Sequence, residues 1–348
     1  MTSAKQRVVV ICPGRGTYNK EELGYLSRLH ADKKELVAQI DAYRQEQEQI
    51  SITELDGMDK YAMRLHTAGE NASALIYACA MADLASIDRD KYEIVAVTGN
   101  SMGWYIALAA AQALAPKGAI ELINTMGSMM SDGVIGGQLI YPVIDQNWHK
   151  DASLEALVDK AVAEVNLLKD AEAYLSIELG GYRVIGGNAK GLKALEEKLP
   201  LLEDRYPMNL FNHAAFHTPL LASVAQKAQQ LLSPELFSAP KVPLIDGLGN
   251  VWQPYSTDAN KLYDYTLQTQ VVDLYRFSRC IEVAIKEFAP DKLIILGPGA
   301  TLGGAVAQCL IEHQWQGIVD KQSFIAQQKQ DPFVLAMGLT DQRKLVVS

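Results

Sequence analysis

The stretch "VAVTGNSMGWYIALAAAQAL", residues 95–114, decides the fold. An apolar strand-like run meets a glycine, a serine and a second glycine, and an alanine-rich segment follows. This order is typical of a buried strand that passes through a tight turn into a helix. The question it raises is whether Ser101 is a nucleophile or an ordinary turn residue that caps the helix.

Two other runs share the character of the strand at 93–97. "VVVIC" (8–12) precedes "PGRG", and "KLIIL" (292–296) precedes "GPG". Short apolar runs rich in β-branched residues are expected of strands buried on both faces of a parallel sheet. Helical patterns are found between them, at residues 68–85, 102–114, 117–131, 219–232 and 273–288. We therefore predict an α/β core with a mostly parallel sheet.

The pattern changes between residues 137 and 211. In order it gives a strand, a helix, two strands joined by Gly180 and Gly181, a second helix and a last strand. This is the β-α-β-β-α-β order of a ferredoxin-like unit. We therefore expect an inserted subdomain at 137–211, with the large domain formed by 1–136 and 212–348.

Composition limits the possible functions. The chain has 348 residues, 49% hydrophobic and 21% charged, and no apolar run reaches the ~18 residues of a membrane helix. A net charge of −9 is the wrong sign for a general nucleic-acid binder. Small molecules or another protein are the expected partners, and no membrane is expected.

The N-terminus and the cysteines suggest a cytoplasmic protein. The first apolar run is too short for the core of a signal peptide. The chain has four cysteines and no C-x-x-C pair, so neither a zinc site nor a disulfide framework is indicated. No metal is therefore expected.

The pentapeptide "GNSMG" (99–103) matches G-x-S-x-G in its expected context. The flanking glycines let neighbouring backbone pass close, so that the serine Oγ projects at the edge of the sheet. The backbone N–H of Met102 then lies at a helix N-terminus, where it can stabilise an oxyanion. The alternative is a strand-to-helix turn in which the serine only caps the helix.

A serine nucleophile requires a base to take its proton. Of the six histidines, His213 and His217 share the loop "NHAAFHTPLL", and His217 comes directly before a predicted helix. Position alone favours His217 over His213 and leaves both open.

Several segments together resemble one family. "TGNSMGWYIALAAAQAL", "AAFHTPLL" and "LGPGATLGG" occur in the order and separation found in malonyl-CoA:acyl-carrier-protein transacylases and polyketide synthase acyltransferase domains. "CPGRGT" resembles the family's F-P-G-Q-G-S, and "QTQVVDLYRFSRCIE" resembles its Q-x-x-x-P-V-x-W segment. The resemblance covers residues 8 to 310. It implies an α/β-hydrolase-like large domain with an inserted ferredoxin-like subdomain and the active site between them.

The resemblance also implies a mechanism. Ser101 would attack an acyl-CoA thioester, and the phosphopantetheine thiol of an acyl carrier protein would then take the acyl group, with His217 as base and acid. A main-chain carbonyl that matches Gln270 would orient the histidine. The main-chain N–H groups of Arg15 and Met102 would form the oxyanion hole. No cofactor is implied beyond the acyl-CoA substrate and the carrier's phosphopantetheine.

One departure from the family bears on the acyl group. Members that accept malonyl bind its carboxylate with an arginine, and the matching segment here, "MGSMMS", places Met126 there. A buried carboxylate without a guanidinium is costly, so a neutral acyl group is favoured. Two residues argue the other way: Phe216 resembles the malonyl-type loop, and Arg15 can supply a substitute cation. Alternatively, Met126 is a core residue and the alignment is shifted by one position.

Three more positions differ from the family. Asn100 replaces its histidine and Trp104 its acidic residue, which alters the pocket wall, although Trp104 is also explained as a packed core residue. Glu178 falls near a family asparagine, which leaves water access open.

These inferences define an acyl-CoA:acyl-carrier-protein S-acyltransferase of fatty acid or polyketide synthesis. The alternatives are an acyl-thioester hydrolase on the same dyad and a non-catalytic scaffold homologue. Docking of an acidic carrier protein would require a local basic patch, and the candidates for it are Arg183, Lys190, Lys193, Arg276 and Arg279.

Overall fold

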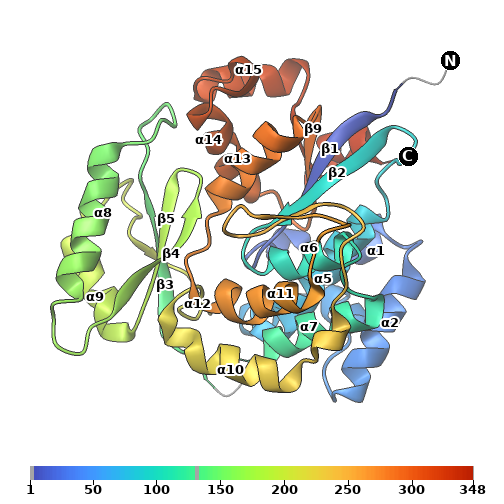
Figure 1. The fold of residues 1–348 in the computed structure, drawn as a ribbon, viewed down its shortest axis with the longest axis horizontal. Coiled ribbons are helices and arrows are strands. Elements are labelled where there is room, and N and C mark those ends of the chain that lie inside the picture. The colour runs from blue at the N-terminus through green and yellow to red at the C-terminus, as the bar shows by residue number, and fades with distance from the viewer. Residues whose placement is uncertain (1–3, 130–132, 348) are drawn as a thin grey trace.

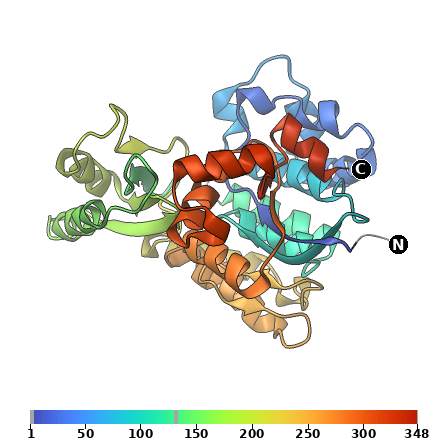
Figure 2. The same ribbon diagram turned by 90° about the horizontal axis from the view of Figure 1, so that it is seen from above.

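The computed structural model describes residues 4–129 and 133–347. Its two β-sheets lie side by side, each with its own helices (Figure 1). The larger sheet and its helices come from both ends of the chain, and the smaller sheet comes from the middle (Figure 2).

The larger sheet has six strands in the order β10-β9-β1-β2-β7-β8. All neighbours are parallel except β7 and β8, which are antiparallel. The strands are β1 (Gln6–Cys12), β2 (Tyr92–Gly99), β7 (Leu244–Ile245), β8 (Val251–Trp252), β9 (Lys292–Ile295) and β10 (Val334–Ala336). Because β1 and β2 are paired up to Cys12 and Gly99, the turns that follow them meet at one edge of the sheet.

Helices cover both faces of this sheet. Helix α6 packs on β1 and β2, while α13 packs on β2 and β7. The helices are α1 (Tyr25–Leu29), α2 (Lys34–Glu46), α3 (Ile52–Asp56), α4 (Met63–His66), α5 (Gly69–Leu84), α6 (Gly103–Ala110), α7 (Pro116–Ser128), α10 (Ala222–Leu231), α11 (Ala259–Asp264), α12 (Gln270–Val272), α13 (Phe277–Phe288), α14 (Leu302–Glu312), α15 (Lys321–Gln330) and α16 (Thr340–Val346).

Short helical turns complete the large domain. Four are 3₁₀ turns: η1 (Lys20–Glu22), η2 (Pro219–Leu221), η3 (Pro234–Leu236) and η5 (Trp315–Gly317). A π-helical segment, η4 (Tyr265–Thr269), lies between α11 and α12. π-Helical segments are rare and are often found at functional sites.

The smaller sheet is antiparallel, with the order β4-β5-β3-β6. Its elements are β3 (Gly137–Pro142), α8 (Ala152–Val165), β4 (Ala173–Leu179), β5 (Tyr182–Gly187), α9 (Ala189–Lys198) and β6 (Met208–Asn209). Helices α8 and α9 lie on one side of it and enclose a separate apolar core. Both the element order and the strand order are those of a ferredoxin-like unit.

The predicted fold class is confirmed, because the mostly parallel sheet and the separate antiparallel sheet are both present. The proposed domain limits at 137 and 211 stay a prediction. Helix α6 ends at Ala110, before the predicted end at 114, and α13 begins at Phe277, not at 273. Residues 130 and 131 of the predicted helix at 117–131 lie outside the described residues.

Among the described residues, no helix is both long and apolar enough to span a membrane.

Candidate active site

Ser101 lies in a strained turn between β2 and α6. Its backbone φ is +56°, in the left-handed region that non-glycine residues rarely adopt. A Cβ on Gly99 would lie 2.2 Å from the Gly103 oxygen, and a Cβ on Gly103 would lie 2.3 Å from the Cys12 oxygen. Both glycines are therefore required by the close approach of backbone, as the pentapeptide predicted.

The glycine turn after β1 packs directly against the serine turn. The Asn100 N–H donates to the Cys12 carbonyl at 3.1 Å, and a Cβ on Gly14 would lie 2.6 Å from the Asn100 oxygen. This contact holds Arg15 beside Ser101. Within residues 4–129 and 133–347, no acceptor is found for the backbone N–H of Arg15 or of Met102.

Ser101 forms a hydrogen bond with His217. The Oγ and Nε2 atoms are 2.7 Å apart, and His217 Nδ1 is 2.6 Å from the main-chain oxygen of Gln270. A carbonyl can only accept, so Nδ1 carries the proton and donates it. Nε2 is then the acceptor, and the Ser101 hydroxyl donates to it.

The position of His217 follows from the end of helix α12. The last carbonyls of a helix lack partners within it. Two of these carbonyls bind the histidine: Gln270 accepts from Nδ1, and Val271 accepts from the His217 backbone N–H at 3.1 Å. His217 itself has a φ of +55°, so both members of the pair adopt strained backbone.

The side chain of Gln270, together with Tyr105 and Tyr275, which the sequence did not single out, holds this arrangement. The Gln270 Nε2 donates to the Ser101 carbonyl at 3.1 Å, and its Oε1 accepts from the Tyr105 hydroxyl at 2.8 Å. The Tyr275 hydroxyl donates to the Gly99 carbonyl at 2.6 Å, and its ring lies 5.1 Å from the imidazole. The three hydrogen bonds each join residues more than 100 positions apart, so no local sequence pattern predicts them.

Burial keeps His217 neutral. Removal from water lowers its pKa to about 4, and the Gln270 carbonyl opposes this only in part. At neutral pH the imidazole is therefore uncharged and can accept a proton.

His213, the alternative base, lies elsewhere in the site. Its Nδ1 donates to Gln138 Oε1 at 2.8 Å, because Gln138 Nε2 already donates to Ser176 Oγ at 2.6 Å. Burial, with a smaller contribution from Arg15, lowers the pKa of His213 to about 3. The structure thus brings His217, and not His213, to Ser101.

Two cavities meet at Ser101. The smaller has a volume of about 50 Å³ and a mostly apolar lining that includes Met102, Tyr105, Met126 and Gln270. The larger, about 590 Å³, is a cleft between the two sheets and includes Gln138 and His213 in its lining. Ser101, Arg15 and Phe216 line both cavities.

Of the two remaining residues predicted to line the pocket, Asn100 does so and Trp104 does not. Asn100 is 8% exposed, lines the cleft, and its Oδ1 has no partner in the part of the chain that is described. Trp104 does not line either cavity: it is fully buried, and its indole N–H donates to Thr266 Oγ1 at 3.0 Å. The expectation that it forms pocket wall is therefore corrected in favour of core packing.

Glu178 also points away from the site. Its neighbours Ile177 and Leu179 line the cleft, while its own carboxylate pairs with Arg183 at 3.3 Å. It therefore has no direct influence on water at Ser101.

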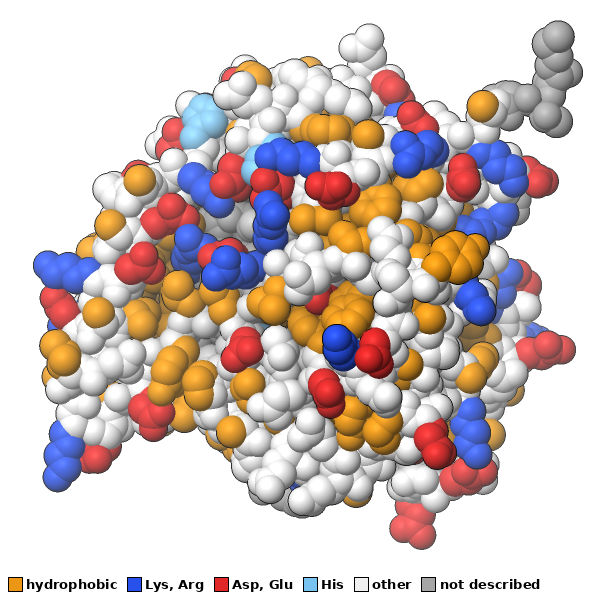
Figure 3. Space-filling model, in the orientation of Figure 1, with side chains coloured by type: hydrophobic (Ala, Val, Ile, Leu, Met, Phe, Trp, Pro, Cys, Tyr) orange, Lys and Arg blue, Asp and Glu red, His pale blue; other side chains and the backbone are white. Residues whose placement is uncertain are grey.

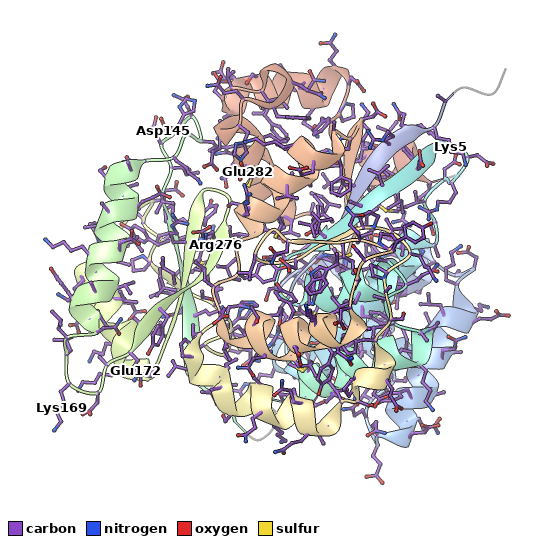
Figure 4. The ribbon with its side chains drawn as sticks, viewed as in Figure 1. Lys5, Asp145, Lys169, Glu172, Arg276 and Glu282 are labelled. Atoms are coloured by element: carbon purple, nitrogen blue, oxygen red, sulfur yellow. The ribbon has the colours of Figure 1, made fainter. Side chains whose placement is uncertain are left out.

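The expected basic docking patch is not free. Three of the five candidates are paired: Arg183 with Glu155 at 2.6 Å, Lys190 with Asp170 at 3.9 Å, and Arg279 with Glu282 at 2.6 Å. Lys193 and Arg276 have no carboxylate within 4.0 Å among the described residues. On the face of the molecule seen in Figure 3, acidic and basic side chains are interleaved. Figure 4 places Arg276 beside the smaller sheet.

Proteins of known identity are similar to this chain in sequence and in fold. No family model matches the chain. The malonyl CoA-acyl carrier protein transacylase of Bacillus subtilis is 29% identical over 209 residues, which are 60% of this chain and 62% of that protein. The match therefore spans less than two thirds of that relative.

Solved structures match over the full length. The malonyl-CoA:ACP transacylase of Synechocystis has a TM-score of 0.73 and 18% identity, with 98% of this chain and 100% of that chain covered. A malonyl-transacylase in complex with its type II polyketide synthase acyl carrier protein also gives 0.73, with 17% identity and 99% of each chain covered.

The fold and the sequence relatives define a homologue of the S-acyltransferases that act on acyl carrier proteins. Within that class, the chain is similar in sequence and in fold to malonyl CoA-acyl carrier protein transacylases, as a distant relative.

Proposed function

We propose that this protein transfers an acyl group from CoA to the phosphopantetheine thiol of an acyl carrier protein. The observation that carries the proposal is the chain of contacts from Ser101 Oγ through His217 to the Gln270 carbonyl, at the floor of a cleft. An aligned hydroxyl and a neutral imidazole with a fixed tautomer are what a serine nucleophile requires.

In the first half-reaction, Ser101 Oγ attacks the thioester carbon and its proton passes to His217 Nε2. The C–S bond breaks, the CoA sulfur takes that proton, and an acyl ester remains on Ser101. In the second half-reaction the carrier's thiol gives its proton to His217 and attacks the ester, and Ser101 Oγ recovers the proton. The unpartnered N–H groups of Arg15 and Met102 are suited to stabilise the oxyanion in both halves.

The two cavities suggest how the substrate is divided. The cleft is large enough for a pantetheine arm, and the unpartnered Asn100 Oδ1 offers an acceptor for one of its amide N–H groups. The smaller cavity would hold the acyl group beside Met126 and Phe216. The neutral acyl group inferred from Met126 stays a prediction, and Arg15 in the same cavity weighs against it.

The carrier protein would approach the open end of the cleft. Support for such a partner comes from the family, which includes a transacylase in complex with its carrier protein. Because three of the five basic candidates are already paired, Lys193 and Arg276 are the better candidates for contacts with an acidic carrier.

The test is to incubate the protein with malonyl-, acetyl- and longer acyl-CoAs and to weigh the intact chain. We expect a covalent adduct that is absent in Ser101→Ala and that disappears when carrier protein bearing phosphopantetheine is added, with acyl carrier protein as product. Release of free acid instead would identify a hydrolase. Absence of any adduct would contradict the proposal and favour a scaffold.

A further inference from the structure

The segment that joins α12 to α13 lies between the two sheets (Figure 1). Tyr275, in this segment, forms a parallel β-bridge with Ile177 of β4, at the edge of the smaller sheet. Its backbone N–H donates to the Ser176 carbonyl at 2.9 Å, and its carbonyl accepts from the Glu178 N–H at 2.9 Å. The main chain of Tyr275 is therefore fixed to the smaller sheet.

The side chain of Tyr275 reaches the larger sheet. Its hydroxyl donates at 2.6 Å to the carbonyl of Gly99, the last residue of β2. Tyr275 is 1% exposed, and burial raises the pKa of its hydroxyl far above the usual value. The hydroxyl therefore keeps its proton at neutral pH. One residue thus joins the end of β2 to the edge of β4.

The hydrogen bond to Gly99 acts on the peptide group that precedes the serine turn. A peptide group is planar, so its oxygen and its N–H rotate together. The group between Gly99 and Asn100 is held at both ends. Its oxygen accepts from Tyr275, and its N–H donates to the Cys12 carbonyl at 3.1 Å. Rotation of this plane, which would help to relieve the positive φ of Ser101, would break both hydrogen bonds.

The ring of Tyr275 packs closely against two neighbours. Its centroid lies 5.1 Å from that of the His217 imidazole, at an interplanar angle of 51°. A Cβ on Gly247 would lie 2.5 Å from the ring atoms Cδ2 and Cε2. A side chain at residue 247 would therefore force the ring to move. The ring thus has little freedom, and it supports the imidazole that binds Ser101 and the Gln270 carbonyl.

We propose that Tyr275 is a positioning residue, which fixes the nucleophile and the base of this site relative to one another. The reaction it serves is the acyl transfer proposed above, so the inference rests on that proposed function. The hydroxyl holds the turn that carries Ser101, the ring packs against His217, and the main chain anchors both to β4. The smaller unit thus contributes to the reaction through Tyr275.

Two tyrosine variants separate positioning from stability. Tyr275→Phe removes the hydroxyl and keeps the ring. Tyr141→Phe is the matched control, because the buried Tyr141 also donates to a main-chain carbonyl, that of Pro200 at 2.9 Å. Tyr141 belongs to the separate core of the smaller unit. Each variant loses one hydrogen bond of the same kind, so both should lower the urea midpoint of unfolding by similar amounts.

The measurement is the rate of Ser101 acylation by malonyl-CoA and by acetyl-CoA over a range of concentrations, followed by intact mass. We expect Tyr275→Phe to lower the rate at saturation roughly 10- to 100-fold, because small displacements of reacting groups have effects of this size. The half-saturating concentration should change less than about two-fold, since the substrate contacts remain. Tyr141→Phe should leave both values unchanged.

A fluorophosphonate probe measures the same alignment without an acyl-CoA. Ser101 Oγ bonds to phosphorus, fluoride leaves, and the hydroxyl proton passes to His217. Tyr275→Phe should slow this labelling as it slows acylation. Gly247→Ala, which keeps the hydroxyl and displaces the ring, should slow both reactions too, and it serves as the test if Tyr275→Phe folds poorly.

The outcomes are distinct. Equal rates in the wild type and Tyr275→Phe, or losses in the two tyrosine variants that follow their unfolding midpoints, would overturn the role of Tyr275 and leave the acyltransferase proposal intact. Labelling by the fluorophosphonate alone, slower in Tyr275→Phe, would overturn acyl transfer and support Tyr275 as a positioning residue of another serine reaction. Failure of both reagents to label Ser101 would overturn both proposals.

Discussion

The turn that carries Ser101 and the small cavity that Ser101 lines are stabilised in different ways. The turn is fixed by backbone: two glycines without room for a Cβ, and carbonyls held by Gln270 and Tyr275. The cavity is lined mostly by apolar side chains from several separate elements. The difference teaches that Ser101 is held by backbone contacts, whereas the cavity in which we propose the acyl group to bind has a wall of side chains that single substitutions can change.

The largest effect is expected where the rigid side carries chemistry. His217→Ala should lower the acylation rate by about 10³-fold, because a positioned base contributes roughly 10²–10⁴-fold. His213→Ala is the matched control, since this histidine binds Gln138 and not Ser101, and it should lose less than about 10-fold. The rate of adduct formation at Ser101 measures both, and equal losses in the two variants would contradict the assignment of His217.

The steric requirement of the turn gives the next largest effect. A methyl group on Gly103 would meet the Cys12 oxygen at 2.3 Å, so Gly103→Ala should lower the free energy of unfolding by about 3 kcal/mol or more. Gly303, in helix α14, has nothing within 4 Å of an added Cβ. Gly303→Ala should therefore stabilise the protein slightly, by up to about 1 kcal/mol. Urea denaturation of the two variants measures the contrast, and similar stabilities would mean that the turn is not tightly packed.

A substitution in the cavity wall should change which acyl-CoAs acylate Ser101 and should have little effect on the stability of the serine turn. Met126→Ala enlarges the cavity and should raise acylation by four- to six-carbon acyl-CoAs about 10-fold relative to acetyl-CoA. Competition between acyl-CoAs, followed by mass, measures this ratio. An unchanged chain-length profile would show that Met126 does not limit the acyl group.

The last prediction concerns the pH dependence of stability. Burial lowers the pKa of His217 to about 4 and that of His213 to about 3, from a usual value of 6.5. As pH falls below 6.5, the unfolded chain binds protons that the folded chain excludes, so stability is lost between about pH 6.5 and 4. Thermal unfolding from pH 7.5 to 4.5 measures the loss, and His213→Gln should reduce it. An identical loss in that variant would contradict the burial of a neutral His213.

Local patterns predicted the elements with strong periodicity or glycine turns. They include strands β1, β2 and β9 and the whole order of the smaller unit. They did not predict strands β7, β8 and β10, which have two or three residues each and are too short to show any periodicity. These strands pair because the neighbouring strands already present an edge.

In the candidate site, too, local sequence patterns predicted some residues, and only the folded structure shows the others. Ser101 was indicated by its own pentapeptide, and His217 by its loop, although the sequence alone left His213 open. The contacts of Tyr105 and Tyr275 join elements far apart in the chain, so only the folded structure shows them. Trp104 was ambiguous for a physical reason, since a helical aromatic residue can face a core or a pocket, and here Thr266 and Tyr265 surround it.

The meeting of both cavities at Ser101 has a kinetic consequence. If one cleft receives the thiol arms of CoA and of the carrier protein in turn, the two cannot be bound there together. Free CoA would then compete with the carrier for the acylated protein and return the acyl group to the donor pool. The net direction of acyl transfer would be set by the ratio of free CoA to free carrier thiol. No conformational change would be needed to enforce the order in which the two substrates bind.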